Sequence, residues 1–93
     1  KNTNVLLSYS NVGLELFPAQ AFVYLMNGKA LNQNKDFKKA IEQLTNGIDF
    51  VIDDTTLEAD FYDELAKSYN GLGNSKEAIK NKNKALALRK NKN

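Results

Sequence analysis

The chain has 93 residues, enough for one small domain with a single hydrophobic core, and it carries a net charge of +2 at neutral pH. It contains no cysteine, which excludes disulfides, thiolate metal sites and thiol nucleophiles, and no histidine, which removes the most common general base and metal ligand. Most hydrolytic mechanisms therefore lack a required catalytic residue in this chain. We expect a non-catalytic protein with no cofactor and no bound metal. No apolar run approaches the ~20 residues that a membrane span needs.

Apolar side chains recur at spacings of three and four residues along most of the chain, which is the pattern of amphipathic helices. Five such segments follow one another, with stripes that begin at Val5, Phe22, Phe37, Leu57 and Ala78. The gaps between them are short, about 2–4 residues, so neighbouring helices should lie antiparallel. The sequence therefore predicts an all-α protein of about five helices, folded as one domain over residues 1–93.

Residues typical of helix ends stand between these segments. Pro18 suits the first turn of the second helix, where its missing N–H costs nothing. Asp36 can cap the third helix, and Asn74 offers a cap to the fifth. Thr55, with Glu58 three residues later, indicates a capping box for the fourth.

The dipeptide Asn-Gly, a strong hairpin signal, occurs three times and offers a β alternative. A hairpin needs alternating apolar residues on both sides of its turn. Around Gly47 the flanking residues Ile41, Leu44, Ile48 and Val51 step by three and four instead, which favours a helix.

Small residues recur at a fixed spacing inside the predicted helices. Gly28 is followed twelve positions later by Ala40, and Ala66 is followed twelve positions later by Ala78. Two antiparallel helices approach closely only where one of them lacks a bulky side chain, so these positions should mark helix crossings. Sliding the chain on itself by 38 residues superposes the two sets, and it also places Tyr24 on Tyr62, Lys29 on Lys67, Asn32 on Asn70 and Ile41 on Ile79. A repeated helix-turn-helix unit of this kind indicates a solenoid.

The stretch YLMNGKALNQNKDFKKAIEQLTNGI resembles a unit of the tetratricopeptide repeat (TPR) family, with Gly28, Ala40 and Gly47 at the family's three small positions. YDELAKSYNGLGNSKEAIKNKNKALAL resembles the unit again, with alanines at the same places, and NVGLELFP resembles the end of a preceding helix. The resemblance implies antiparallel helix pairs stacked as an α-solenoid. The implied units are a half repeat over residues 5–17, a first repeat over 18–54 and a second repeat over 55–93.

Two features depart from the family pattern. The period is 38 residues rather than 34, which predicts that the third and fourth helices are each extended by a turn. Lys82 stands where a large apolar residue would receive a following repeat, so the fifth helix is predicted to be a polar cap at the C-terminal end of an array. The richness in asparagine and lysine points to a bacterial source, while the compartment stays open.

In the TPR family the first helix of each repeat lines an inner, concave surface, and the resemblance implies peptide binding there. In this chain that face carries Phe22, Leu25, Met26, Lys29 and Asn32, then Asp60, Asp63, Glu64, Lys67 and Asn70. Phe22, Leu25 and Met26 could equally pack against the first helix. The three neighbouring acids should repel one another unless a cation meets them, which favours a protein or peptide ligand with an apolar anchor and a basic flank. The family's lysine–asparagine clamp for a peptide carboxylate is not matched, because Leu25 and Glu64 occupy two of its positions.

The sequence thus predicts a non-catalytic protein-interaction scaffold. The alternative is structural self-association, in which two chains form a homodimer through apolar residues of the half repeat that lack a covering helix. These residues are Val5, Leu6, Leu7, Val12 and Leu14.

Three other stretches offer different kinds of site. GLGNSKEA, over residues 71–78, lacks the third glycine and the preceding strand of a dinucleotide-binding loop. The acids between Glu42 and Glu64 lack the glycine of an EF-hand, and most of them suit helix starts. The basic residues from Lys76 to Lys92 could hold phosphates, but no aromatic residue among them could stack on bases. Solvated surface is favoured for both charged stretches, and no nucleic-acid partner is predicted.

Overall fold

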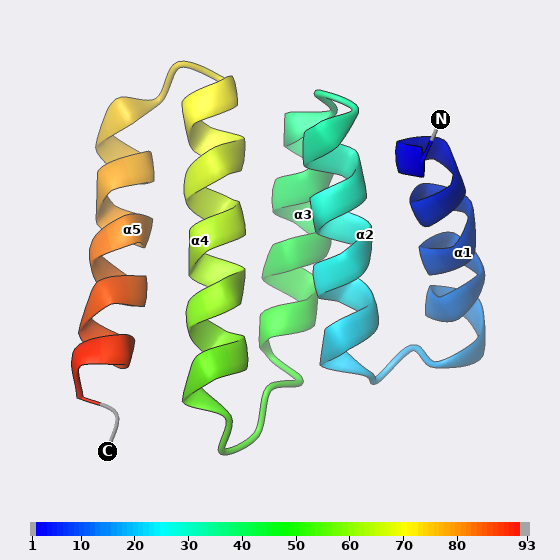
Figure 1. Ribbon diagram of the computed structural model, residues 1–93, viewed down its shortest axis with the longest axis horizontal. Helices are drawn as coiled ribbons and strands as arrows, with labels where there is room; N and C mark the ends of the chain where they lie inside the picture. Colours follow the sequence, from blue (N-terminus) through cyan, green and yellow to red (C-terminus); the bar gives the residue numbers. More distant parts are fainter. Residues whose placement is uncertain (1, 92–93) are drawn as a thin grey trace.

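A computed structural model describes residues 2–91, and within that range the chain forms five α-helices and no strand. The helices are α1 (Asn2–Leu16), α2 (Ala21–Gln33), α3 (Phe37–Ile48), α4 (Thr55–Gly71) and α5 (Ser75–Lys90). Successive helices run in opposite directions (Figure 1), which confirms the all-α prediction and the antiparallel order. None of the described helices is both long and apolar enough to cross a bilayer.

The helices form a slab. The Cα atoms extend over 34 × 31 × 20 Å, and α2 and α3 overlap in the view down the shortest axis (Figure 1). Along the chain, α1 packs on α2, α2 on α3, α3 on α4 and α4 on α5. In addition α4 packs on α2, so that α4 is seated against both members of the α2–α3 pair.

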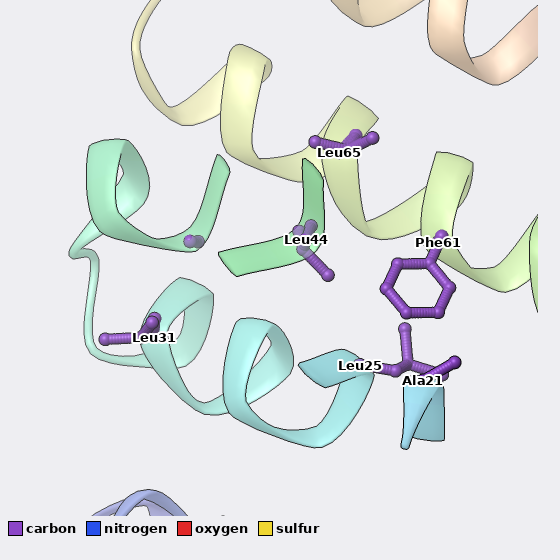
Figure 2. Close-up of a cluster of buried hydrophobic side chains, with 7 residues drawn as sticks. Ala21, Leu25, Leu31, Leu44, Phe61 and Leu65 are labelled. Atoms are coloured by element: carbon purple, nitrogen blue, oxygen red, sulfur yellow. The ribbon is translucent and has the colours of Figure 1, made fainter. Parts of the chain in front are cut away.

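The hydrophobic core lies where α4 meets α2 and α3. Phe61 of α4 is fully buried and is the largest side chain in that state, and Leu44 of α3 is also fully buried. Figure 2 shows the Phe61 ring pointing from α4 toward Ala21 and Leu25 of α2. Leu65, one turn further along α4, completes the contact. The core therefore joins elements that are distant in the sequence.

The small residues lie at helix contacts, as their spacing predicts. A Cβ atom on Gly28 would overlap the side chain of Leu44 in α3, and a Cβ atom on Gly47 would overlap Tyr24 in α2. Ala40, Ala66 and Ala78 are all buried. At Gly28 and Gly47, α2 and α3 approach to a separation that leaves no room for a larger side chain.

The helix ends agree only in part with the sequence. Asn74 caps α5, since its side-chain oxygen accepts a hydrogen bond from the Glu77 amide at 3.2 Å. The cap of α4 is Asp54, which accepts from the Leu57 amide at 2.9 Å, so the capping box predicted at Thr55 is wrong by one residue. Asp36 occupies the cap position of α3 but makes no capping hydrogen bond with its side chain.

Pro18 was expected in the first turn of the second helix, but it lies in the preceding turn. The helix begins three residues later, at Ala21. The carbonyl oxygen of Pro18 accepts a hydrogen bond of 2.6 Å from the hydroxyl of Tyr24. This bond ties the turn to the first turn of α2.

The long period is accommodated by α4 and by the loop that precedes it. α4 has 17 residues, whereas α3 has only 12 and ends at Ile48, so the predicted extension of the third helix is wrong. The additional residues form a loop that is fixed by two contacts. The ring of Phe50 stacks on Tyr24 with 5.6 Å between centroids, and Val51 packs against the core. These contacts favour the loop over another helical turn.

Candidate binding groove between α4 and α5

A hollow of about 660 Å³ lies along α4 and α5, with one side chain contributed by α2. Six of the ten residues predicted for the concave face line it: Lys29, Asp60, Asp63, Glu64, Lys67 and Asn70. They share one side of α4, except for Lys29, which reaches the hollow from α2. The buried alanines Ala66 and Ala78 also line it, because their small side chains leave space at the α4–α5 crossing. We call this hollow the α4–α5 groove.

The other four predicted residues do not line this groove. Leu25 belongs to the hydrophobic core, where it is 3% exposed, because its side of α2 faces α4. Met26 is half-buried, and Phe22 is exposed in the first turn of α2. Asn32 is buried and forms hydrogen bonds to α4. A binding role predicted for Leu25 is thus contradicted by its burial, since no ligand can reach it in the folded chain.

The acids of the groove are paired with cations of the same chain. The guanidinium of Arg89 donates to Asp60 at 2.8 Å and to Asp63 at 2.7 Å, and Lys82 contacts Asp63 at 3.1 Å. The hydrogen bond to Asp63 raises the pKa of Arg89 above its ordinary value, so this side chain is charged at neutral pH. The mutual repulsion inferred from the sequence is therefore relieved from within.

Glu64 is also paired, and it is buried. One carboxylate oxygen contacts the ammonium of Lys67 at 3.1 Å, and the other accepts from the Asn32 side-chain amide at 3.1 Å. Four cations, Arg89 included, thus face three carboxylates in and beside the groove. Lys29 is the cation that makes no ion pair with the described residues. The groove has a mixed lining rather than the acidic one that the sequence suggested.

A buried polar network joins α2 to α4 beneath the groove. The amide of Asn32 donates to the backbone carbonyl of Glu64 at 3.0 Å, and its oxygen accepts from the hydroxyl of Ser68 at 2.7 Å. Ser68 is fully buried. Every one of these groups has a partner, which is the condition under which buried polar groups stabilise a fold. Asn32 is thereby a structural residue that sets how α4 sits on α2.

Replacing Asn32 with alanine is expected to lower the free energy of unfolding by about 1–3 kcal/mol, because Glu64 and Ser68 lose buried hydrogen-bond partners. Urea denaturation followed by circular dichroism measures the change. Asn83→Ala on the exposed side of α5 is the matched control and should cost less than about 0.5 kcal/mol. Equal losses in the two variants would show that the network contributes nothing beyond helix propensity.

Four residues of the groove were not predicted as ligand-binding residues: Ala66 and Ala78, which were predicted only as helix-crossing positions, and Ile79 and Lys82. Ile79 is 61% exposed in the groove wall and provides its one large aliphatic side chain. Lys82 lies next to it along α5 and holds Asp63. The internal repeat could have identified Ile79 and Lys82. Shifting the sequence by 38 residues places Ile79 on Ile41 and Lys82 on the core residue Leu44. The pairing of Arg89 with α4 has no counterpart in any local sequence pattern.

The same shift relates the α4–α5 groove to the surface that α4 itself occupies. On the α2–α3 pair, Leu25 and Leu44 receive α4 through apolar contacts. At the corresponding places the α4–α5 pair carries Asp63 and Lys82, which form an ion pair. The first helix pair is thus covered by a helix, while the corresponding surface of the second is open and polar.

The acidic residues between Glu42 and Glu64 form no metal site, and Lys92 of the basic stretch lies outside the described residues. Among residues 2–91 no three acidic side chains come together in a way that could hold a metal ion.

No protein-family model matches this chain, and a search of curated proteins returns no relative.

Proposed function

We propose that the chain is a non-catalytic protein-interaction module of the TPR type, in which antiparallel helix pairs stack as a solenoid and the α4–α5 groove binds a partner. Three observations support the arrangement. The helices alternate in direction, α4 packs on both α2 and α3, and the small residues of the repeat lie at helix contacts.

The observation that carries the binding role is the open groove, because its counterpart on α2 and α3 is filled by a helix. A surface shaped to receive α4 in one repeat should receive a helix of similar width in the next. We therefore propose a helical segment of a partner protein as the ligand. An apolar side chain of this segment would contact Ile79. The small side chains of Ala66 and Ala78 would allow the segment to approach the groove closely.

The charges of the groove favour a ligand with an acidic group beside its apolar anchor, whereas the sequence predicted a basic one. Asp60, Asp63 and Glu64 are already neutralised by Arg89, Lys82 and Lys67, so they provide little additional attraction for a basic ligand. Lys29 has no such pair among residues 2–91. A carboxylate on the ligand would complement Lys29 without displacing an existing ion pair.

Selection of helical peptides from a displayed library tests this proposal. Selected peptides are expected to bind the wild-type chain and to lose about tenfold or more in affinity on Ile79→Glu, because a charge would enter the apolar contact. Ile52→Glu is the matched control, since Ile52 is 80% exposed in the loop between α3 and α4. Isothermal titration calorimetry gives the affinities. Peptides that bind Ile79→Glu as well as they bind the wild type would exclude the groove.

Ile79→Glu is a cleaner probe than reversing the charges of Asp60, Asp63 and Glu64. Those three side chains hold α4 to α5 and to α2 through ion pairs and hydrogen bonds, so reversing them would disturb the fold. Ile79 is exposed, and its replacement leaves those contacts in place.

A further inference from the structure

α1 and α5 lie at opposite ends of the molecule (Figure 1). The exposed face of α1 carries a stripe of apolar side chains. Val5, Tyr9, Val12 and Leu16 follow one another at three- and four-residue spacing and are 52%, 74%, 51% and 66% exposed. The stripe is about 16 Å long at the rise of an α-helix. A patch of this kind is larger than the isolated apolar residues that are normal on a protein surface.

The charge of α1 restricts what can cover the stripe. Glu15 is the only charged residue in the helix, and the exposed residues beside the stripe, Asn4, Ser8 and Asn11, are neutral. A matching surface must therefore be apolar and nearly free of charge. The exposed aliphatic residues of α5, Ile79 and Leu86, do not qualify, because they lie on a strongly basic helix. The stripe on α1 of a second copy does qualify.

The shape of the stripe also suits a second copy. A shallow hollow of about 340 Å³ on α1 is lined by Asn4, Val5, Ser8 and Tyr9. If two α1 helices pair antiparallel about the midpoint between Tyr9 and Val12, Leu16 of each copy lies over this hollow in the other. Tyr9 then lies opposite Val12. The two stripes are thus self-complementary, as a twofold interface requires.

The single charge selects between the two possible directions. In a parallel pair the two Glu15 carboxylates would lie side by side and repel. In the antiparallel pair they lie at opposite ends of the interface. We propose that this chain forms a symmetric, antiparallel homodimer through the α1 stripe, a property independent of the proposed groove function. Because the stripe is short, we expect a dissociation constant on the order of 10–100 µM.

Sedimentation equilibrium over a range of chain concentrations tests the dimer. The wild type is expected to pass from monomer to dimer, and Val12→Glu should weaken the dimer at least tenfold. Val12 is about half exposed, so this variant should fold, which circular dichroism verifies. Ile52→Glu, a like change at an 80% exposed position in the loop between α3 and α4, should leave the dimer unchanged. A wild type that is monomeric at 1 mM, or an equal effect of the two variants, would overturn the proposal.

Cross-linking tests the antiparallel register in a chain that has no native cysteine. Val5→Cys and Leu16→Cys should form a mixed disulfide when the two variants are combined under mild oxidation, since these positions face each other. Each variant alone should cross-link slowly, because identical positions lie about 16 Å apart along the axis. Faster cross-linking of either variant alone would exclude the antiparallel pairing.

Discussion

Phe61→Ala is expected to lower the free energy of unfolding by about 3–5 kcal/mol, the range found for removing a fully buried phenylalanine side chain. Phe61 is 0% exposed, and it joins α4 to both helices of the preceding pair. The substitution forfeits the free energy gained by moving the ring out of water. It also leaves a cavity beside Ala21 and Leu25 that the surrounding helices cannot fully close. Chemical denaturation monitored by circular dichroism gives the value.

Phe22→Ala provides the matched control, because it is the same chemical change at a position that is 59% exposed. Its cost should be below about 0.5 kcal/mol. The difference between the two variants isolates the contribution of burial. Similar losses in both would mean that α4 does not sit on the α2–α3 pair through Phe61.

Gly47→Leu is expected to destabilise the chain by about 3 kcal/mol, at the upper end of the usual range for overpacking. A Cβ atom at this position would overlap the Cβ atom of Tyr24 and approach the Phe61 ring at 3.0 Å. The Tyr24 Cβ is attached directly to the backbone of α2, so it cannot rotate away. The two helices would have to separate, and the Tyr24–Phe50 stack would be strained with them.

Asn46→Leu is the control for this variant, since it places the same side chain on the neighbouring, exposed position of α3. Both variants change helix propensity, and only Gly47→Leu changes the helix crossing. Thermal and urea denaturation of the pair measure the difference. If the two variants were equally stable, the close approach of α2 and α3 at Gly47 would be excluded.

The fold was largely predictable because its signals are local. Amphipathic periodicity located all five helices, and the capping preference of Asn74 gave the start of α5. The start of α4 was missed by one residue because Asp54 and Thr55 are both good capping residues, and only the geometry shows which of them accepts the amide. The end of α3 was missed because stacking of Phe50 on Tyr24, a tertiary contact, favours a loop there.

The candidate site was less predictable because its charges are satisfied by distant residues. Helical spacing correctly grouped Asp60, Asp63 and Lys67 on one face of α4. It could not show that Arg89, at the far end of α5, pairs with both Asp60 and Asp63, because that contact depends on how α5 lies against α4. It also could not distinguish exposed Phe22 from buried Leu25 three positions later.

The ion pair of Lys82 and Asp63 has a consequence for the stacking of helix pairs in the proposed solenoid. At the equivalent places in the preceding pair, Leu44 and Leu25 form an apolar seat for the next helix. In the proposed solenoid, two changes, Asp63→Leu and Lys82→Leu, would recreate that apolar seat on the α4–α5 pair. An engineer could then use this surface to stack an additional helix pair on α4 and α5 by changing both side chains together.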